Sequence, residues 1–259
     1  MSYPKKETPY IALNEFKILS VTKAINGLIS GFPAESRPAT NSTCTDILYH
    51  YTSIEKLFSI LEGDSFWASR SRFSNDSTEG EILGEEWVNR EQYYGDNYIV
   101  CFCGDNDKLS QWRGYCPNGG ASIGFKFISE STYTICKSGT SEPKSNMELY
   151  KNTPLPVIYC RTDNRAENDS GIYDVKENLQ NSWREIEKLL PDKNKGLYKI
   201  GLRDIVPYLK SGYFIEESEY RLMFDNSNGE LEDYIQFRTL TDGTKIPYII
   251  IKYGNLLRG

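Results

Sequence analysis

The sequence predicts a single α+β domain built on a mainly antiparallel sheet. Three observations lead to this fold class. Segments with the short apolar pattern of strands outnumber segments with helical spacing. The helical patterns fall early and in the middle of the chain, rather than alternating with strands as they do around a parallel sheet. In the last third, two strand-like segments flank the turn Thr241-Asp242-Gly243, which is a hairpin signal.

The first 45 residues are expected to form a helical segment and a connecting loop, ahead of a domain at residues 46–259. Residues 10–31 place apolar side chains at helical spacing, at Ile11, Leu13, Phe16, Ile18, Leu19, Val21, Ile25 and Leu28. Residues 32–45 are rich in Pro, Ser and Thr, which is typical of loops. The helical segment could provide a surface for a second copy of the chain or a regulatory partner.

A strand that runs directly into a helix is expected to begin the domain. Residues 48–51 have the pattern of a short strand, and Thr52 or Ser53 is placed to cap a helix with apolar residues at positions 54, 57, 58 and 61. His50 is the only histidine of the chain. Polar side chains at such corners commonly face a cleft, so we expect His50 to face one.

The remaining elements are expected in the following order. Strands are predicted at residues 66–69, 98–104, 121–128, 155–161, 219–225, 233–240 and 245–254. Helices are predicted at residues 78–94, capped by residues 74–77, and at residues 174–191, ended by Pro191. Residues 105–120 are predicted to be a loop between two buried strands.

Composition narrows the function classes. The 259 residues carry a net charge of -6, which weighs against a broad nucleic-acid surface because phosphate affinity comes from clustered Lys and Arg. No apolar run approaches the roughly 18 residues of a membrane helix, and the basic start lacks the apolar core of a signal peptide. The six cysteines show no paired metal knuckles and are expected to be buried, reduced thiols of a cytoplasmic protein.

Two stretches have the residue types of a functional site. In residues 214–224, Glu217, Glu219 and Arg221 would share one face of a strand whose other face is apolar; the alternative is a solvated edge with an ordinary ion pair. Residues 109–115 and the following glycines could stack a flat ring and hold a phosphate, or could be a packed loop that covers the core.

Other chemistries have less support. No Walker loop, dinucleotide-binding glycine motif or nucleophile elbow is present. A magnesium-dependent nuclease using Asp76, Glu79 and Glu81 would require these acids to converge, whereas acids after a turn more often cap a helix. No metal site is expected.

Four spaced motifs resemble an uncharacterised bacterial family, catalogued as domain of unknown function 2971. They are YHYTS at residues 49–53, FSND followed by Ser77 and Glu79, LSQWRGY with GGASIGF at residues 109–125, and E-x-E-Y-R at residues 217–221. The resemblance spans His50 to Phe224 and therefore most of the chain.

The chain also resembles, more distantly, the ADP-ribosyltransferases. The resemblance lies in a strand with His50 and Thr52, the helix that follows, and a later strand that begins at Glu219, with Glu217 matching the E-x-E arrangement of arginine-modifying toxins. Tyr51 stands where these enzymes usually have glycine. The resemblance implies a split antiparallel sheet and NAD+ as substrate.

The resemblance also implies a role for each site residue. Glu219, with Glu217, would stabilise the cation-like ribose centre as nicotinamide leaves. His50 and Thr52 would hold the two riboses. Trp112, Tyr115 or Tyr51 would stack on nicotinamide, and the pyrophosphate would pair with one or more arginines, namely Arg70, Arg72 and Arg113.

The expected function is therefore that of an NAD+-consuming enzyme, an ADP-ribosyltransferase or NAD+ glycohydrolase acting as a bacterial toxin or anti-phage effector. Its acceptor, whether protein, nucleic acid or water, stays open, and no membrane partner is expected. The alternative is a sensor module that binds a nucleotide or protein without turnover. The two differ in one geometric requirement: the enzyme needs His50 and Glu219 to line one pocket.

Overall fold

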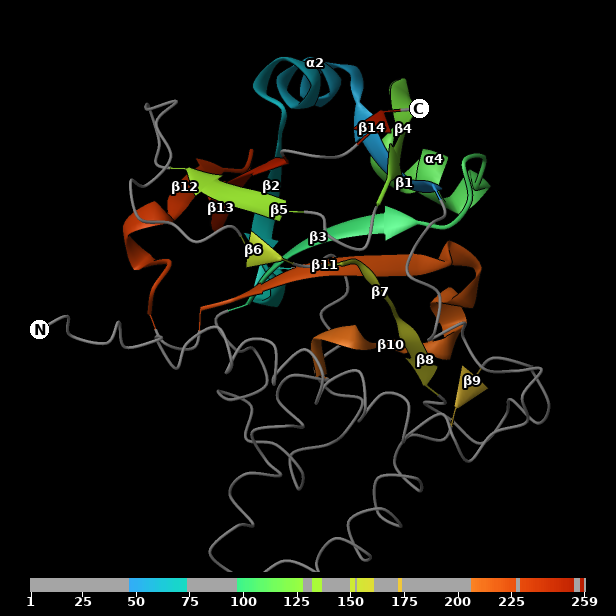
Figure 1. The fold of residues 1–259 in the computed structure, drawn as a ribbon. Coiled ribbons are helices and arrows are strands. Elements are labelled where there is room, and N and C mark those ends of the chain that lie inside the picture. Colours follow the sequence, from blue (N-terminus) through green and yellow to red (C-terminus); the bar gives the residue numbers. More distant parts are fainter. Residues whose placement is uncertain are drawn as a thin grey trace, which may run out of the picture.

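The structure of this chain, a computed structural model, is mostly β with few helices (Figure 1). A large, curled antiparallel sheet dominates it, and a small parallel sheet lies beside strand β11. The described residues are 47–73, 97–127, 132–136, 150–151, 153–160, 172–173, 206–226, 229–253 and 257–258.

The elements have the following bounds. The large sheet contains β1 (Ile47–Ser53), β2 (Ser65–Arg70), β3 (Asn97–Cys103), β4 (Gly120–Lys126), β5 (Thr132–Cys136), β6 (Tyr150–Lys151), β7 (Leu155–Pro156), β11 (Glu219–Asp225), β12 (Gln236–Thr239), β13 (Lys245–Tyr253) and β14 (Leu257–Arg258). The small sheet contains β8 (Ile158–Cys160), β9 (Ile172–Tyr173) and β10 (Leu209–Ser211). The helices are α2 (Ile54–Gly63), α4 (Leu109–Tyr115) and the 3-10 turns η2 (Ser71–Phe73), η5 (Val206–Tyr208), η6 (Gly212–Glu217) and η7 (Glu232–Tyr234).

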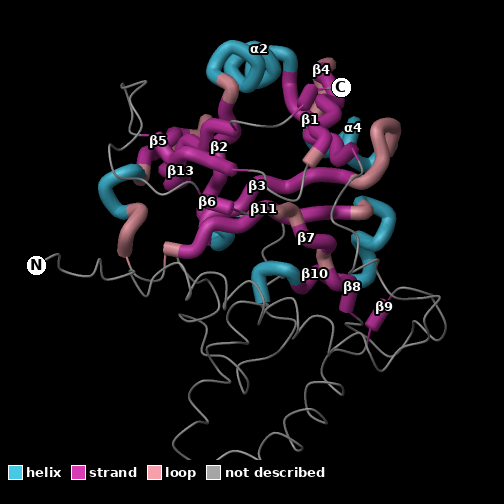
Figure 2. Tube along the Cα trace, in the orientation of Figure 1, coloured by secondary structure: helices cyan, strands magenta, loops and turns pink. Residues whose placement is uncertain are grey.

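Strand β3 is the centre of the large sheet. One edge of β3 pairs with β1 near its end, at Tyr49↔Cys103, and with β2 near its start, at Ser69↔Ile99. Its other edge pairs with β11 along its whole length. From β1 the sheet continues to β4 and β14, and from β2 it continues to β13, β5 and β12. Because β1 and β2 diverge from β3, the sheet curls around one of its faces (Figure 2).

The hydrophobic core fills the inside of this curl. Its side chains come from alternate positions of the strands, as expected for a sheet with one buried face. Phe66, Phe102 and Phe125 pack with edge-to-face ring geometry near its centre. Helix α2 covers one end through Ile60, and the Tyr253 hydroxyl donates to the Ile60 carbonyl at 3.1 Å. We call this side of β3, which carries Val100 and Phe102, the core face and the opposite side the outer face.

The predicted order of elements is confirmed at most described positions. The strand at His50 runs directly into α2, whose N-cap position is Ser53, although the Ser53 side chain makes no capping bond. The strands predicted from residues 66, 98, 121, 219 and 245 are present within two residues of the expected starts. The C-terminal hairpin is β12–β13, and Gly243 in its turn has a φ of 86°, which favours glycine.

Two predictions were wrong. Residues 105–120 were expected to be a loop, but residues 109–115 form α4. The Lys108 N–H at its start is satisfied by the Tyr51 hydroxyl at 2.9 Å, a long-range contact that local spacing does not reveal. Residues 155–161 were expected to be one strand, but they form β7 and β8 in different sheets. Pro156 has no N–H to continue a ladder, and the Val157 N–H bonds to the Glu219 carbonyl instead.

Some predictions lie outside the described residues. These are the helical segment and loop at residues 1–45, and the helices at residues 78–94 and 174–191. No described helix is both long and apolar enough to cross a membrane.

Candidate functional site

The strand register separates His50 from Glu219. In paired antiparallel strands, residues directly opposite each other point to the same face. Glu219 lies opposite Cys103, and Cys103 lies opposite Tyr49, so Glu219 belongs to the outer face. His50 follows Tyr49 in β1 and therefore points to the core face. The two side chains lie on opposite sides of the sheet and do not line one pocket.

His50 occupies the place where β1 and β2 diverge. Its ring packs edge-on against Phe66 and Phe102, with centroids 5.9 and 5.8 Å away. Its Nδ1 lies 2.9 Å from the Cys101 carbonyl oxygen. A carbonyl only accepts, so Nδ1 carries the proton. Burial lowers the pKa of His50, although the bond to Cys101 opposes this shift. The neutral ring thus donates a hydrogen bond to a backbone carbonyl where β1 and β2 diverge.

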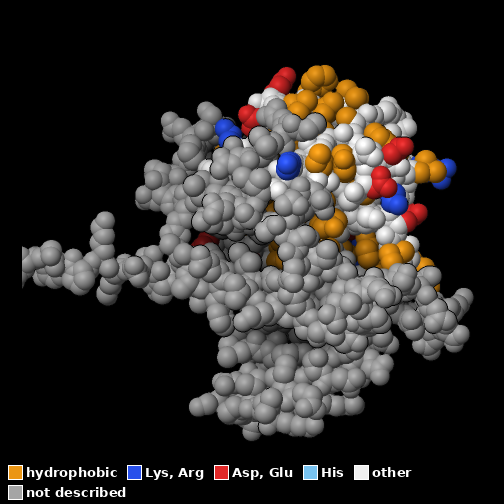
Figure 3. Space-filling view, turned by 45° about the vertical axis from the view of Figure 1, so that its right-hand side comes forward, with side chains coloured by type: hydrophobic (Ala, Val, Ile, Leu, Met, Phe, Trp, Pro, Cys, Tyr) orange, Lys and Arg blue, Asp and Glu red, His pale blue; other side chains and the backbone are white. Residues whose placement is uncertain are grey.

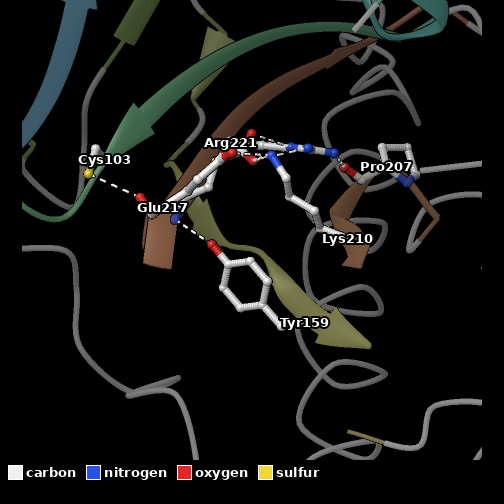
Figure 4. Close-up of polar contacts among 7 residues, drawn as sticks. Cys103, Tyr159, Pro207, Lys210, Glu217 and Arg221 are labelled. Carbon is white, nitrogen blue, oxygen red and sulfur yellow. Dashed lines mark hydrogen bonds and ion pairs between the residues drawn. The ribbon is translucent and has the colours of Figure 1, made fainter. Parts of the chain in front are cut away.

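Glu219 is held in a buried network of charges (Figure 4). Its Oε1 accepts from Arg221 Nε at 2.7 Å, and its Oε2 accepts from Lys210 Nζ at 2.7 Å and from Arg221 at 3.2 Å. The Glu219 residue is 6% exposed and Arg221 is 2% exposed. Burial alone would raise the pKa of Glu219, but Arg221 and Lys210 outweigh it and lower the pKa to about 2. The solvated-edge alternative for this stretch is therefore excluded.

Glu217 joins the same network from a different element. It was expected on the strand face of Glu219, but it ends η6, and Ser218 then adopts a left-handed conformation with a φ of 46°. Glu217 Oε2 nevertheless accepts from Lys210 Nζ at 2.7 Å, so one ammonium bridges both carboxylates. The side chain of Glu217 is 17% exposed against 7% for Glu219. Glu217 is the more accessible carboxylate.

The aromatic residues of α4 lie beside this network. Helix α4 packs against β1 and η6. Trp112 packs edge-on against Tyr51, with centroids 4.9 Å apart, and its Nε1 donates to Asp107 at 2.9 Å. Burial raises the pKa of the Tyr115 hydroxyl, and Cys101, Glu219 and Glu217 raise it further. The residue as a whole is 41% exposed.

The proposed stacking residues are now distinguishable. Tyr51 is 5% exposed, and its hydroxyl is used twice, donating to the Asp105 carbonyl at 2.8 Å and accepting from Lys108 N–H. Tyr51 therefore supports the start of α4 and has no exposed ring face for stacking. Trp112 and Tyr115 remain as candidates, with Tyr115 the more exposed.

The three candidate arginines and Thr52 do not all lie near the network of Glu219. Arg113, in α4, is exposed. Arg70 lies opposite Tyr98, five residues along β3 from the position of Glu219, or about 17 Å at strand spacing. Arg72 follows in η2, at the same distant end. Thr52 is 3% exposed and shares the core face with His50, so the structure brings neither of them to the carboxylates.

We use the name acidic corner for this network together with the helix beside it. The network is Lys210, Glu217, Glu219 and Arg221, supported by Tyr51 and Tyr159. The helix is α4, which packs against η6 and carries Trp112, Arg113 and Tyr115. Lys210 and Tyr159 were not predicted as site residues from the sequence. The Tyr159 hydroxyl accepts from the Glu219 backbone N–H at 2.8 Å, and burial raises its pKa. The available signal for Lys210 was a lysine directly after two apolar residues, in the run Tyr208-Leu209-Lys210.

The described cysteines are free thiols, as predicted. Cys103 donates to the Glu217 carbonyl at 3.0 Å, and burial raises its pKa, so it stays protonated. In the described ranges, no group of His, Cys, Asp and Glu side chains is arranged to hold a metal ion. The acids of the nuclease alternative, Asp76, Glu79 and Glu81, lie outside those ranges.

Charged side chains are otherwise dispersed. On the face shown in Figure 3, basic and acidic groups of the described residues are interspersed, and hydrophobic side chains gather at the top, over α2. This distribution agrees with the exposure of Ile54 and Phe58 in that helix.

A profile of the family described as Protein of unknown function (DUF2971) matches residues 111–222. The chain thus contains this domain, from within α4 to within β11. Of the four sequence motifs, E-x-E-Y-R lies inside the match, LSQWRGY with GGASIGF lies inside it except for its first two residues, and YHYTS and FSND lie before it. No curated protein and no solved structure matches the chain. These comparisons give the resemblance to ADP-ribosyltransferases no support.

Proposed function

We propose that this protein is a nucleotide-binding module whose site is the acidic corner, with a dinucleotide of the NAD+ type as its ligand. One observation favours the binding of NAD+ over its cleavage by Glu219. Both carboxylate oxygens of Glu219 are neutralised by Arg221 and Lys210, and the residue is 6% exposed. A neutralised, inaccessible carboxylate is poorly placed to stabilise a developing cation.

Three features of the corner favour a nucleotide. Tyr115 presents an exposed ring on which a base or nicotinamide can stack. Arg113 is an exposed guanidinium in the same helix, and guanidinium pairs well with phosphate oxygens. Glu217 is the partly accessible carboxylate, which can accept hydrogen bonds from ribose hydroxyls. In this assignment His50, Thr52 and Tyr51 support the fold and do not touch the ligand.

The second candidate is the NAD+-consuming enzyme that the transferase resemblance implies. The accessibility of Glu217 favours it. An ionised Glu217 beside the bound ribose would stabilise positive charge as the bond between ribose and nicotinamide breaks. Nicotinamide would leave with the bonding electrons, and water or another acceptor would take the ribosyl group. The ADP-ribosyltransferase-like form of the sheet, a cytoplasmic location and a role as toxin or anti-phage effector belong to this candidate.

A binding titration with NAD+ tests the proposal. We expect measurable binding by calorimetry, and we expect Arg113→Gln to weaken it about tenfold, the loss of one charge-assisted phosphate contact. Lys56→Gln removes the same charge from the exposed face of α2 and should leave the affinity unchanged. No heat of binding, or equal effects of the two substitutions, would refute the site.

Nicotinamide release from the same samples separates the two candidates. If the protein is a binding module, we expect no nicotinamide release above the level of a buffer blank. This holds with or without a cell lysate that supplies acceptors. Release that is abolished by Glu217→Gln, in a variant that still binds NAD+, would establish the enzyme in place of the module.

A further inference from the structure

A second surface of aromatic and polar side chains lies on the outer face of the sheet, away from the acidic corner. Trp67 in β2 stacks on Tyr248 in β13, with ring centroids 4.6 Å apart and planes 23° from parallel. Trp67 is 45% exposed, whereas Tyr248 is 8% exposed. Tyr248 therefore supports one face of the indole, and the other side of the indole is open to solvent. A supported, exposed tryptophan is a ready platform for a flat ring.

Polar groups flank this platform on the same face. Gln236 of β12 lies opposite Tyr248, and the Tyr248 hydroxyl donates to its Oε1 at 3.1 Å. Arg238, two residues further along β12, donates from its guanidinium to the Ser69 hydroxyl at 3.1 Å. Trp67 and Ser69 are neighbours on the outer face of β2. We call these five residues, Ser69, Trp67, Gln236, Arg238 and Tyr248, the tryptophan face.

Two donors of the tryptophan face are not satisfied within the described residues. Arg238 Nε and Gln236 Nε2 are buried donors that find no hydrogen-bond partner there. Arg238 also forms no ion pair with any described residue. Burial lowers its pKa, but a guanidinium remains charged. Burying unpaired donors costs free energy, and an uncompensated cation favours the binding of an anion.

A ligand that suits this surface combines an aromatic ring with an anion. An aromatic base can stack on Trp67, and a phosphate can neutralise the partly exposed Arg238. Free nucleotides are usually bound in concave pockets that enclose most of their surface. Exposed aromatic side chains on an open sheet face, beside a cation, are instead the arrangement that binds single-stranded nucleic acid.

We propose that the tryptophan face binds single-stranded nucleic acid, one base stacking on Trp67 and its phosphate pairing with Arg238. The surface is small, which is consistent with a net charge of -6 that weighs against a broad nucleic-acid footprint. It is also separate from the acidic corner. Ser69 lies opposite Ile99 of β3, four residues from Cys103, which lies opposite Glu219; this is about 13 Å at strand spacing.

Fluorescence anisotropy with labelled single strands of deoxythymidine and of uridine, at low salt, tests the proposal. We expect both strands to bind and the matched duplex to bind at least tenfold more weakly. Trp67→Ala should weaken binding about tenfold or more through the loss of one stacked base. Arg238→Gln should weaken it and reduce the slope of log affinity against log salt by about one phosphate contact.

Two control substitutions lie on the opposite face of the same hairpin. Phe237 is 63% exposed in β12, and Lys245 pairs with Thr239 at the start of β13. Phe237→Ala and Lys245→Gln remove an exposed ring and a cation there and should leave binding unchanged. Trp67→Phe keeps a ring and should retain part of the affinity, which guards against loss of the fold in Trp67→Ala.

Several results would overturn the proposal. They are the absence of binding by the wild type, equal affinity for duplex and single strand, equal effects of the test and control substitutions, and displacement of the strand by a mononucleotide at an equal concentration of phosphate. Binding of NAD+ by Trp67→Ala is expected to match the wild type. Failure at the tryptophan face is therefore distinguishable from failure at the acidic corner.

Discussion

At the scale of single residues, Lys210 decides whether the acidic corner is stable. Its ammonium lies 2.7 Å from a carboxylate oxygen of both Glu217 and Glu219, and its side chain is only 7% exposed. With Arg221 the cluster holds two cations and two anions and is neutral. Buried charges of this kind contribute little net stability when complete, but removing one of them leaves another without compensation.

We therefore expect Lys210→Met to lower the free energy of unfolding by about 3–5 kcal/mol. The double variant Lys210→Met with Glu217→Gln again balances the charge, with one anion beside Arg221, and should recover a large part of the loss. Urea unfolding at neutral pH measures both. A single variant within about 1 kcal/mol of the wild type would show that solvent already screens the cluster.

The residue scale also explains what the sequence could not reveal about the site. The motif E-x-E-Y-R marked Glu219 and Arg221 correctly as partners, because alternate positions of a strand share a face. It misplaced Glu217, since the left-handed Ser218 ends η6 immediately before the strand. His50 was assigned to the wrong side of the sheet, because the face of a strand depends on its register with distant partners and not on its own sequence.

At the scale of elements, the close approach of β4 to β1 positions α4. A Cβ added at Gly120 would overlap the Thr52 carbonyl oxygen and would lie 2.5 Å from the Cys116 sulfur. Cys116 follows the last residue of α4 and donates to the same Thr52 carbonyl at 3.3 Å. The absence of a side chain at residue 120 thus lets the end of α4 rest on β1.

Gly120→Ala should therefore destabilise the protein by about 1–3 kcal/mol, the usual cost of overpacking. Gly114→Ala is its control. Gly114 lies inside α4, an added Cβ meets nothing within 4 Å, and alanine should raise stability by up to about 1 kcal/mol through helix propensity. Thermal unfolding of the two variants, followed by circular dichroism, compares them directly. Equal shifts in Tm would contradict this account of the contact.

Local patterns located most described strands and α2, since apolar alternation and helical spacing are properties of neighbouring residues. They failed where distant residues decide the outcome. Helix α4 begins where Tyr51 satisfies the Lys108 N–H, and the strand at residue 155 breaks where Val157 bonds to Glu219. Tyr159 and Lys210 enter the acidic corner from the small sheet, whose position relative to β11 is a tertiary property.

At the scale of the whole molecule, two groups with lowered pKa values shape the pH dependence of stability. The pKa of Glu219 is about 2, below its unfolded value. Its contribution is present above that unfolded value and is lost as the pH falls toward 2. The pKa of His50 is lowered by burial. In the unfolded chain His50 takes up a proton near pH 6.5, roughly the usual value, whereas the folded protein resists it until a lower pH.

Because the unfolded state binds the extra proton in this window, we expect the free energy of unfolding to fall between about pH 7.5 and about pH 5.5. His50→Gln, whose amide can still donate to the Cys101 carbonyl, should flatten this part of the curve. The single histidine also allows a direct measurement, since its ring proton signal in an NMR titration needs no assignment. A midpoint at or above the usual value would show that the ring is solvated and is not part of the core at the divergence of β1 and β2.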